Sequence, residues 1–442
     1  MADEWIEYVN DTRTICKYGV KCYQKNPDHH KQFKHPPKNL RKDVNRDGRN
    51  KRRYSPYTRE SPRQSPKPQT RDDSPKPQTR DDSPSASEEK PVNDDSDQKT
   101  SDGKDNKPEE PKLADQTLEE SFNINLPEDI TYYDKSTDNS LLKELFLVEM
   151  PEDFFKFFEC ISEGGKSVEE TLASVNLMPI GPYELLMGKL PKLDNKELYL
   201  IHWRFFFDPA EFQAVLKKKK NSAYHIGYFR DDPEEKPAFV ASNDCDKDYH
   251  ITPMAYNIFG AVYVYLQNEK KHSPFTAMSC QKLMDNIKQY AEEHKISLEE
   301  FNMKKRLAQT VTRSFHGAGI VVPYNKKTQV GYRRLVETDA NLRKLFASLA
   351  KATDQKEKEK LLSDLQPVIT YASIALDESD FGTGLEVGIA LFCSGLKELE
   401  PSALSSFTSA YFVLNRKPFG DIIQAHLKYR RKGPNVSMLH LK

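Results

Sequence analysis

A polar, proline-rich segment, about residues 38–115, most constrains how this 442-residue chain can fold. It is nearly free of aliphatic side chains and carries the sequence SPKPQTRDD twice in tandem, at residues 65–73 and 74–82. Residues 38–63 hold ten basic and three acidic side chains, whereas residues 81–110 hold four and eleven. Such a segment cannot bury a core, so we expect a disordered linker between a short N-terminal piece and a large C-terminal region.

The whole chain has 67 basic and 67 acidic side chains, so its total charge indicates no class of partner. No apolar run approaches the ~18–20 residues of a membrane helix. The acidic start, Met1–Tyr8, lacks the apolar stretch of a secretory signal. We therefore expect neither a membrane helix nor a signal peptide. The basic cluster Lys51–Arg53 is either a nuclear localisation signal or a plain basic patch. Four cysteines show no pairing pattern, which fits a reducing compartment, nuclear or cytosolic: Cys160, Cys245, Cys280 and Cys393.

Residues 13–37 have the ligand spacing of a small zinc finger. Two thiols and two imidazoles follow as Cys16-x5-Cys22-x6-His29-x5-His35, and zinc takes four such ligands. A piece this short has no core, so metal binding must supply its folding free energy. His30 is the alternative third ligand, although His29 is favoured. The spacing is not that of DNA-reading fingers, and we expect no sequence-specific DNA binding.

The finger sequence resembles the PBZ finger, a poly(ADP-ribose)-binding module. The resemblance implies that Tyr18 and Tyr23 stack on adenine, a contact of about 1–3 kcal/mol per base. The family usually has an arginine where this chain has Gln24, which puts one phosphate contact in question. Other cations could supply the charge: Arg13, Lys17, Lys21 and Lys25. The alternative is a purely structural finger.

The C-terminal region, about residues 116–442, is predicted to be an α+β fold in two lobes, a mixed α/β lobe over 116–268 and a mainly helical lobe over 269–442. Aromatic runs predict strands at Leu198–Phe207 and Tyr224–Arg230. Pro151 opens a predicted helix over Met150–Cys160. A capping box at Ser297 and Glu300 predicts a helix start, and Pro367 suits a first helical turn.

Helical spacing of apolar residues predicts two buried faces in the second lobe. These are Leu342, Leu345, Phe346 and Leu349, and then Leu404, Phe407, Tyr411 and Leu414. Two glycine-bearing loops are expected at Phe315–Val321, which continues to Tyr332 and Arg333, and at Leu376–Gly384. His316 could be a site residue, but a structural hydrogen-bonding role is favoured. The basic stretch Lys428–Lys432 is expected to be a solvated helix end.

No enzyme signature is visible in the C-terminal region. The glycines at 382, 384 and 388 do not match the dinucleotide-binding fingerprint, and we expect Gly384 and Gly388 to permit close helix packing. Three carboxylates within four residues do stand out, at Asp377, Glu378 and Asp380. From spacing alone, helix capping explains them best, because acids are favoured at a helix start by about 0.3–1 kcal/mol each.

Five stretches of this region resemble the histone PARylation factors, accessory proteins of the DNA-damage-activated poly(ADP-ribose) polymerases. They are Ile201–Phe207, Tyr224–Pro233, Ser314–Pro323, Val330–Leu342 and Leu376–Gly395. The resemblance covers essentially all of residues 116–442. Finger and linker are additions that not every member carries.

The resemblance implies roles for single residues. Glu378 would be the carboxylate lent to the polymerase active site, with Asp377 on the polymerase surface and Asp380 supporting the loop. Tyr332 and Arg333 match an interface position. Two departures near this position could tune partner choice, at Arg334 and Val336.

These observations predict a nuclear accessory factor on chromatin at DNA damage sites. It would not be an enzyme by itself: the polymerase binds NAD⁺, and this chain contributes a base that directs ADP-ribosylation to serine on histones and other proteins. One alternative is a non-catalytic poly(ADP-ribose) reader or scaffold in which the acids only cap a helix. An independent hydrolase is disfavoured, since nothing in the sequence would bind its substrate.

Overall fold

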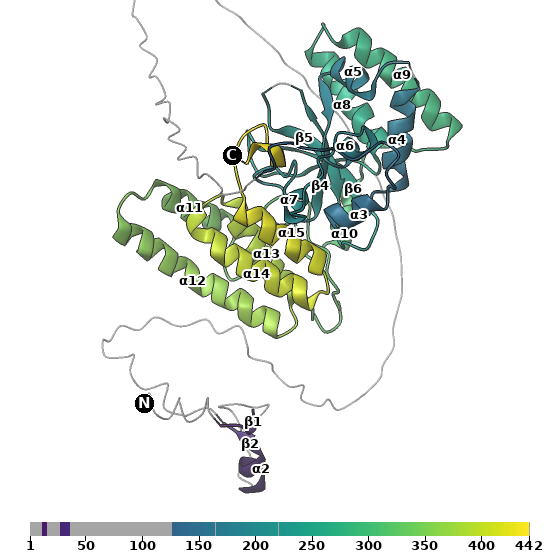
Figure 1. The fold of residues 1–442 in the computed structure, drawn as a ribbon. Coiled ribbons are helices and arrows are strands. Elements are labelled where there is room, and N and C mark those ends of the chain that lie inside the picture. The colour runs from purple at the N-terminus through teal and green to yellow at the C-terminus, as the bar shows by residue number, and fades with distance from the viewer. Residues whose placement is uncertain (1–10, 16–26, 36–125, 164, 220, 442) are drawn as a thin grey trace, which may run out of the picture. The chain divides into compact units, whose positions relative to one another are not determined.

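The structure, a computed structural model, falls into two units, residues 1–109 and 110–442, which are described separately. It describes residues 11–15, 27–35, 126–163, 165–219 and 221–441 (Figure 1). The expected linker lies outside these residues. The elements of the smaller unit are β1 (Thr14–Ile15), α2 (Pro27–Gln32) and β2 (Phe33–Lys34). Strands β1 and β2 pair in parallel. Among the described helices, none has the length and apolarity to cross a membrane.

The first half of the larger unit is built on a five-stranded antiparallel sheet in the order β3-β4-β5-β6-β7 (Figure 1). The strands are β3 (Leu177–Pro179), β4 (Phe212–Lys218), β5 (Tyr224–Phe229), β6 (Phe239–Asp244) and β7 (Thr252–Ala255). Consecutive residues of β4 and β5 are buried, so both faces of the sheet are covered. The helices of this half are α3 (Leu141–Phe146), α4 (Glu152–Ser162), α5 (Val168–Ala173), α6 (Pro182–Leu186), α7 (Glu197–Leu200), α8 (Ile258–His272), α9 (Ala277–Glu293) and α10 (Met303–Gln309).

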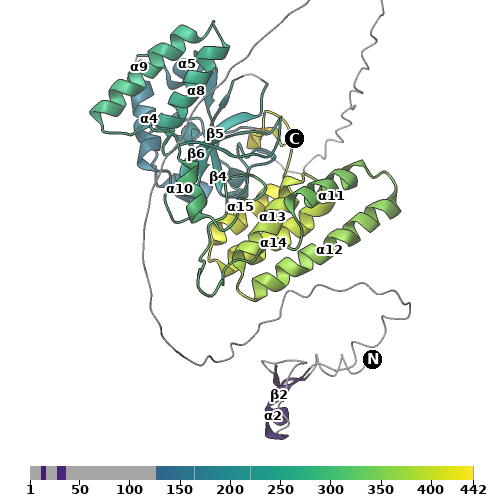
Figure 2. The ribbon, with the colours of Figure 1, turned by 180° about the vertical axis from the view of Figure 1, so that it is seen from behind.

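The second half is helical, and α13 lies at its centre (Figure 2). Its elements are α11 (Asp339–Lys351), α12 (Gln355–Asp377), α13 (Phe381–Cys393), the short 3₁₀ helix η2 (Lys397–Leu399), α14 (Glu400–Val413), α15 (Lys417–Lys428) and η3 (Met438–His440). Every residue of α13 after Phe381 is buried. A Cβ on Gly384 would lie 3.1 Å from Leu376 of α12, and one on Gly388 would lie 3.2 Å from the Phe407 ring of α14. The expected close packing at these glycines is confirmed.

Both halves share one large hydrophobic core. Polar contacts also cross between them: Tyr411 donates a hydrogen bond to Glu211 at 2.7 Å, and Arg416 pairs with Asp232 at 3.2 Å. Near the C-terminus the chain returns to the first half, where the Trp203 N–H donates to the Val436 carbonyl at 3.1 Å. The lobes are therefore parts of one folded body. Helix α8 runs across residues 268 and 269, where the sequence analysis divides them.

The overall class, a finger followed by an α+β region that ends in helices, is confirmed. Strand β5 occupies Tyr224–Phe229, and α4 follows directly on Pro151. The two predicted helical faces lie on α11 and α14 and bury most of their apolar members: Leu342, Phe346, Leu349, Phe407 and Tyr411. Amphipathic spacing identified these helices because burial of one face is what stabilises them.

The predicted strand at Leu198–Phe207 is wrong. These residues continue from α7 into turns, and Trp203 adopts a positive φ of 57°. Trp203 and Phe205 belong to a second, smaller cluster of buried apolar residues, which also contains Phe212 of β4. The aromatic run therefore signalled burial against the sheet rather than membership of it, because packing context overrides β-propensity.

Two further local predictions are wrong. Ser297 and Glu300 start no helix; α10 begins at Met303, where the Asn302 side chain accepts hydrogen bonds from two backbone N–H groups. Pro367 lies inside α12 rather than in its first turn. The proline leaves the Ser363 carbonyl without its helical donor, but both residues are exposed, so water can satisfy that carbonyl.

The stretch Lys428–Lys432 is a solvated helix end only in part: α15 ends at the exposed Lys428, but the Arg430 side chain is buried. The Arg430 guanidinium lies 3.9 Å from the Phe206 ring centroid and 4.0 Å from that of Phe392, and it donates to the Phe392 carbonyl. Burial lowers the pKa of Arg430 to about 10, so this side chain stays charged at neutral pH. Its partner carboxylate is Glu400, at 3.1 Å. Arg430 is thus a structural residue that ties the C-terminal segment to both halves.

Candidate functional site

The acidic cluster lies in a tight turn between α12 and α13. The expected loop Leu376–Gly384 is shorter than predicted, because only residues 378–380 fall outside the two helices. Ser379 has a φ of 71°. Its N–H donates to the Leu376 carbonyl at 3.0 Å, and the Asp380 N–H donates to the Ala375 carbonyl at 2.8 Å. These two bonds form a Schellman motif, which ends α12 and fixes where the carboxylates emerge.

Arg333 holds two of the three carboxylates. Its Nε donates to Asp380 Oδ2 at 2.5 Å, and its Nη2 donates to Glu378 Oε2. The other Asp380 oxygen accepts the Gly331 N–H at 3.0 Å. The backbone of Arg333 is held as well, since its N–H donates to the Thr383 hydroxyl and its carbonyl accepts from that hydroxyl. The segment 331–333 is therefore fastened to the start of α13.

The three acids differ in exposure and in bonding. The Asp380 side chain is 11% exposed, whereas that of Glu378 is 60% exposed. Within the described part of the chain, Asp377 makes no ion pair, and Arg333 is the only ion-pair partner of Glu378. Partial burial lowers the pKa of Arg333, but the hydrogen bonds that Arg333 donates to both carboxylates outweigh this effect and raise the pKa overall. Asp380 is thus a structural residue, and Glu378 is an accessible carboxylate that is paired with Arg333.

Tyr332 points into the protein rather than to a free surface. Its hydroxyl donates to Glu386 Oε2 at 3.2 Å, and Thr312 donates to Glu386 Oε1 at 2.7 Å. Burial raises the pKa of Glu386, and burial together with Glu386 raises the pKa of Tyr332 to about 12. The phenol therefore stays protonated and serves as a donor. Sequence reasoning missed Glu386, although a single charge inside the otherwise apolar helix α13 was its signal.

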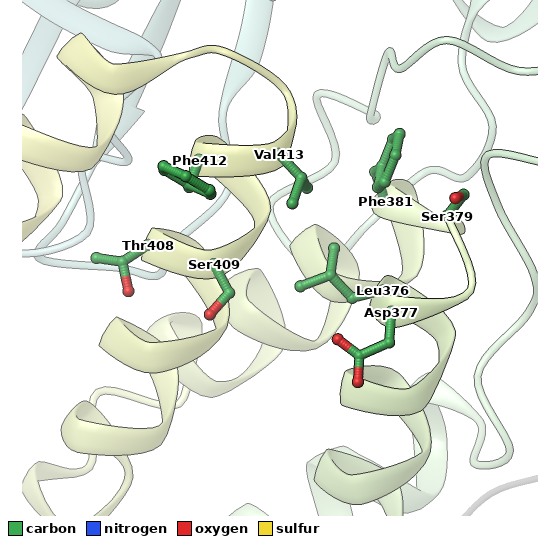
Figure 3. A pocket seen from close by; sticks show the side chains of 8 residues that line it. All are labelled: Leu376, Asp377, Ser379, Phe381, Thr408, Ser409, Phe412 and Val413. Carbon is green, nitrogen blue, oxygen red and sulfur yellow. The ribbon is translucent and has the colours of Figure 1, made fainter. Parts of the chain in front are cut away.

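An open groove of about 680 Å³ runs beside the turn between α12 and α14. Figure 3 shows the Asp377 carboxylate at its edge, directed toward α14. The remaining lining residues are mostly apolar or hydroxylated: Leu376, Ser379, Phe381, Thr408, Ser409, Phe412 and Val413. Phe412 is 81% exposed. The groove has no arrangement of polar groups for a nucleotide, and its apolar wall suits a protein surface.

Large exposed apolar side chains gather around this turn. Eleven are found in the described residues, and six of them belong to α12, α14 or the segment 323–336 that Arg333 fastens to α13. These six are Tyr324, Val330, Val336, Ile374, Phe412 and Val413. Exposed apolar side chains of this kind are typical of protein interaction sites. Glu378 is therefore an exposed carboxylate in a part of the unit whose elements carry six such side chains.

His316 is a structural residue, as favoured from the sequence. Its Nδ1 accepts the Ala318 N–H at 3.1 Å and lies 3.2 Å from the Ser314 hydroxyl. Burial and the nearby Arg306 lower the pKa of His316 to about 3, so the ring is neutral at physiological pH. It is 2% exposed and cannot reach a substrate.

A second cluster of possible ligand atoms lies inside the sheet half, at Asp208, His225 and Cys245. His225 Nε2 lies 2.7 Å from Asp208 Oδ1, and its Nδ1 lies 2.7 Å from the Ala223 carbonyl. Both ring nitrogens thus face oxygen atoms at hydrogen-bond distance. We interpret the cluster as an internal hydrogen-bond network.

In the finger, the described residues include both expected histidine ligands. Their Nε2 atoms lie 3.2 Å apart, with His29 on α2 and His35 just after β2. Burial and the neighbouring rings of His30 and His29 lower the pKa of His35, which favours the neutral ring that binds metal. This arrangement fits two corners of a tetrahedral zinc site. The other predicted finger residues lie outside the described residues: Cys16, Cys22, Tyr18 and Tyr23.

Fold and site together define a two-part protein, in which a finger unit accompanies an α+β unit with an exposed carboxylate near exposed apolar side chains. Comparisons with known families agree with this division. The model described as histone PARylation factor 1 matches residues 137–430, and the model of the PBZ domain, a zinc finger, matches residues 13–38. The chain belongs to the histone PARylation factor 1 family, and its N-terminal PBZ finger implies zinc binding.

Individual relatives agree with the family match. The chain is 36% identical to histone PARylation factor 1 of Danio rerio over 295 residues, which cover 65% of this chain and 84% of the relative. It is 36% identical to that of Mus musculus over 307 residues, or 67% and 88%. It is 35% identical to the putative histone PARylation factor 1-like protein of Homo sapiens over 314 residues, or 68% and 90%.

Proposed function

We propose that the α+β unit docks on a DNA-damage-activated poly(ADP-ribose) polymerase and completes its active site with Glu378. The polymerase binds NAD⁺, and this chain alone is not an enzyme. The observation that carries the proposal is the accessible Glu378 carboxylate, which Arg333 holds beside elements with exposed apolar side chains. The membership of the histone PARylation factor 1 family supports polymerase and histones as partners.

The chemistry assigns Glu378 the role of general base. A serine hydroxyl is a weak nucleophile at neutral pH, and a positioned base contributes about 10²–10⁴-fold to such a reaction. Glu378 takes the hydroxyl proton while the serine oxygen forms a bond to the anomeric carbon of the NAD⁺ ribose. The bond from that carbon to nicotinamide breaks, and nicotinamide leaves with the electron pair. The negative charge of Glu378 also stabilises the positive charge that develops on the ribose.

Arg333 and Asp380 are positioning residues in this proposal. Arg333 contacts Glu378 through one nitrogen and the buried Asp380 through another, so it can release Glu378 and still remain anchored. Asp377 and the groove between α12 and α14 would contact the polymerase surface. Tyr332 would hold the segment 331–333 in place through its hydrogen bond to Glu386.

A reconstituted reaction tests the role of Glu378. Polymerase, broken DNA, NAD⁺ and a histone peptide that contains Lys-Ser are mixed with wild type or Glu378→Gln. We expect serine modification with wild type only, while Glu378→Gln still binds the polymerase. Asp421→Asn, a change of an exposed acid paired with Lys417 on α15, is the matched control and should retain activity. If Glu378→Gln supports wild-type serine modification, the non-catalytic scaffold is the better description.

The finger would bind zinc through Cys16, Cys22, His29 and His35, and poly(ADP-ribose) through Tyr18 and Tyr23. It would hold the factor near polymer at chromatin in the nucleus, because a tethered second contact acts at high effective concentration. Polymer retention on a filter tests this. The double change Tyr18→Ala with Tyr23→Ala should weaken retention at unchanged zinc content, and unchanged retention would leave a purely structural finger.

A further inference from the structure

A hairpin beside the acidic turn presents basic side chains that form no ion pair with the described residues. Lys326 and Lys327 are exposed at its tip, and neither forms an ion pair or a side-chain hydrogen bond within the described chain. The same holds for Arg334, although its charge acts on the buried Glu386. We define these three residues as the basic rim. Residues 323–337 contain four basic side chains and one acidic one, and the acidic turn already neutralises Arg333.

The hairpin is built to hold the rim in one place. Asn325 Oδ1 accepts the N–H groups of Lys327 at 2.9 Å and Thr328 at 3.2 Å, and the Asn325 N–H donates to the Val330 carbonyl at 2.9 Å. Gly331 closes the hairpin with a φ of 114°, and a Cβ there would lie 2.1 Å from the Pro323 carbonyl oxygen. A fixed loop of this kind loses little conformational freedom when it binds.

The rim also has a fixed relation to Glu378. The Gly331 N–H donates to Asp380 at 3.0 Å, and the Gly331 carbonyl accepts the Gly382 N–H at 2.9 Å. These two hydrogen bonds connect the segment that carries the basic rim to the turn that carries the acids Asp377 and Glu378. Charges of opposite sign on two sides of an interface set the orientation of the partner and steer its approach.

We propose that the basic rim, Lys326, Lys327 and Arg334, docks against a carboxylate-bearing surface of the polymerase catalytic domain and sets the orientation in which Glu378 enters its active site. This inference rests on the proposed function. The exposed Tyr324 and Val330 on the same hairpin supply the apolar contact between these charges. Interface charges of this kind act mainly on the association rate, which they raise most at low salt.

Association kinetics with the polymerase catalytic domain test the proposal. The rim variant carries Lys326→Glu and Lys327→Glu in the full chain. The control variant carries Lys356→Glu and Lys360→Glu, two exposed lysines of α12 without a described ion pair, so the net charge changes equally. Lys360 lies eighteen residues before Glu378, which corresponds to about 27 Å along the helix axis. Arg334→Glu is measured separately as a single change.

We expect the rim variant to associate about tenfold more slowly than wild type at low salt, with a flatter salt dependence. The control should stay close to wild type, and the dissociation rates of all variants should be similar. If wild type binds, two results would overturn the role of the rim. Either the rim and control variants associate equally slowly, or neither associates more slowly than wild type. Failure of wild type to bind at all would instead overturn the proposed function.

Discussion

Truncation of the three acids of the turn should separate their roles by stability. Asp380 is buried and accepts hydrogen bonds from Arg333 Nε and the Gly331 N–H. Bonds that involve a charged group contribute about 1.5–3 kcal/mol each. Because Arg333 keeps Glu378 and some water as partners, we take values near the low end. Asp380→Ala should therefore lower the free energy of unfolding by about 2–4 kcal/mol.

The other two acids should behave differently. Glu378 is 60% exposed, and exposed ion pairs contribute about 0–1 kcal/mol. Asp377 is exposed and makes no described ion pair, so its truncation should stay within about 0.5 kcal/mol. If all three acids merely cap the helix, their truncations should instead cost similar amounts, about 0.3–1 kcal/mol each.

Urea unfolding at pH 7, followed by far-UV circular dichroism, measures these differences. With a denaturant dependence of about 3 kcal/mol/M, Asp380→Ala should lower the midpoint by about 1 M, and Glu378→Ala by less than about 0.3 M. Asp380→Asn keeps the shape and removes the charge, so its midpoint should fall between those of wild type and Asp380→Ala. A loss for Glu378→Ala as large as that for Asp380→Ala would refute the division into anchor and accessible base.

Four further outcomes follow from the described contacts. Ser379→Gly should raise the free energy of unfolding by about 1 kcal/mol in the same urea assay, because it relieves the left-handed backbone at φ 71°; a loss of stability would contradict this. Gly388→Ala should lower it by about 1–3 kcal/mol, since the added Cβ would lie 3.2 Å from the Phe407 ring; a neutral effect would mean that α13 and α14 can separate freely. The pKa of His316 in the folded state, about 3, lies below its ordinary value of 6.5, so the neutral ring stabilises the fold above pH 6.5 and this contribution is lost as the pH falls toward 3. His316→Asn should accordingly flatten the decline of the urea midpoint over that pH range, and an unchanged slope would show that other groups cause it. Zinc chelation should remove one metal ion per chain but leave far-UV circular dichroism nearly unchanged, whereas collapse of the helical signal would place zinc in the α+β unit.

The sequence predicts elements best where one local rule decides them. Amphipathic spacing identified α11 and α14, because this pattern states which face of a helix is buried. A segment rich in aromatic residues identified β5, which is buried on both faces. The run Leu198–Phe207 misled because aromatic content signals burial without saying whether a segment joins the sheet or packs on it. Pro367 misled because a helix tolerates a proline where water can reach the freed carbonyl.

At the candidate site, sequence reasoning found the acids but not their order of importance. Spacing brought Asp377, Glu378 and Asp380 together, and a resemblance added Arg333. Which acid is buried depends on the contact between Arg333 and a turn some 45 residues later in the chain, and no local pattern encodes that contact. The hydrogen bonds of Thr383 with the Arg333 backbone and of Thr312 with Glu386 were missed for the same reason.

The left-handed turn and its arginine support have a consequence for affinity. A flexible, exposed acidic side chain loses conformational entropy when a partner immobilises it, which costs about 0.5–1.5 kcal/mol of binding free energy. Here the cost is met during folding, because the backbone at Ser379 is already bent and Arg333 already selects one arrangement of Glu378. An incoming protein thus meets a pre-organised carboxylate, which corresponds to roughly a three- to tenfold gain in binding.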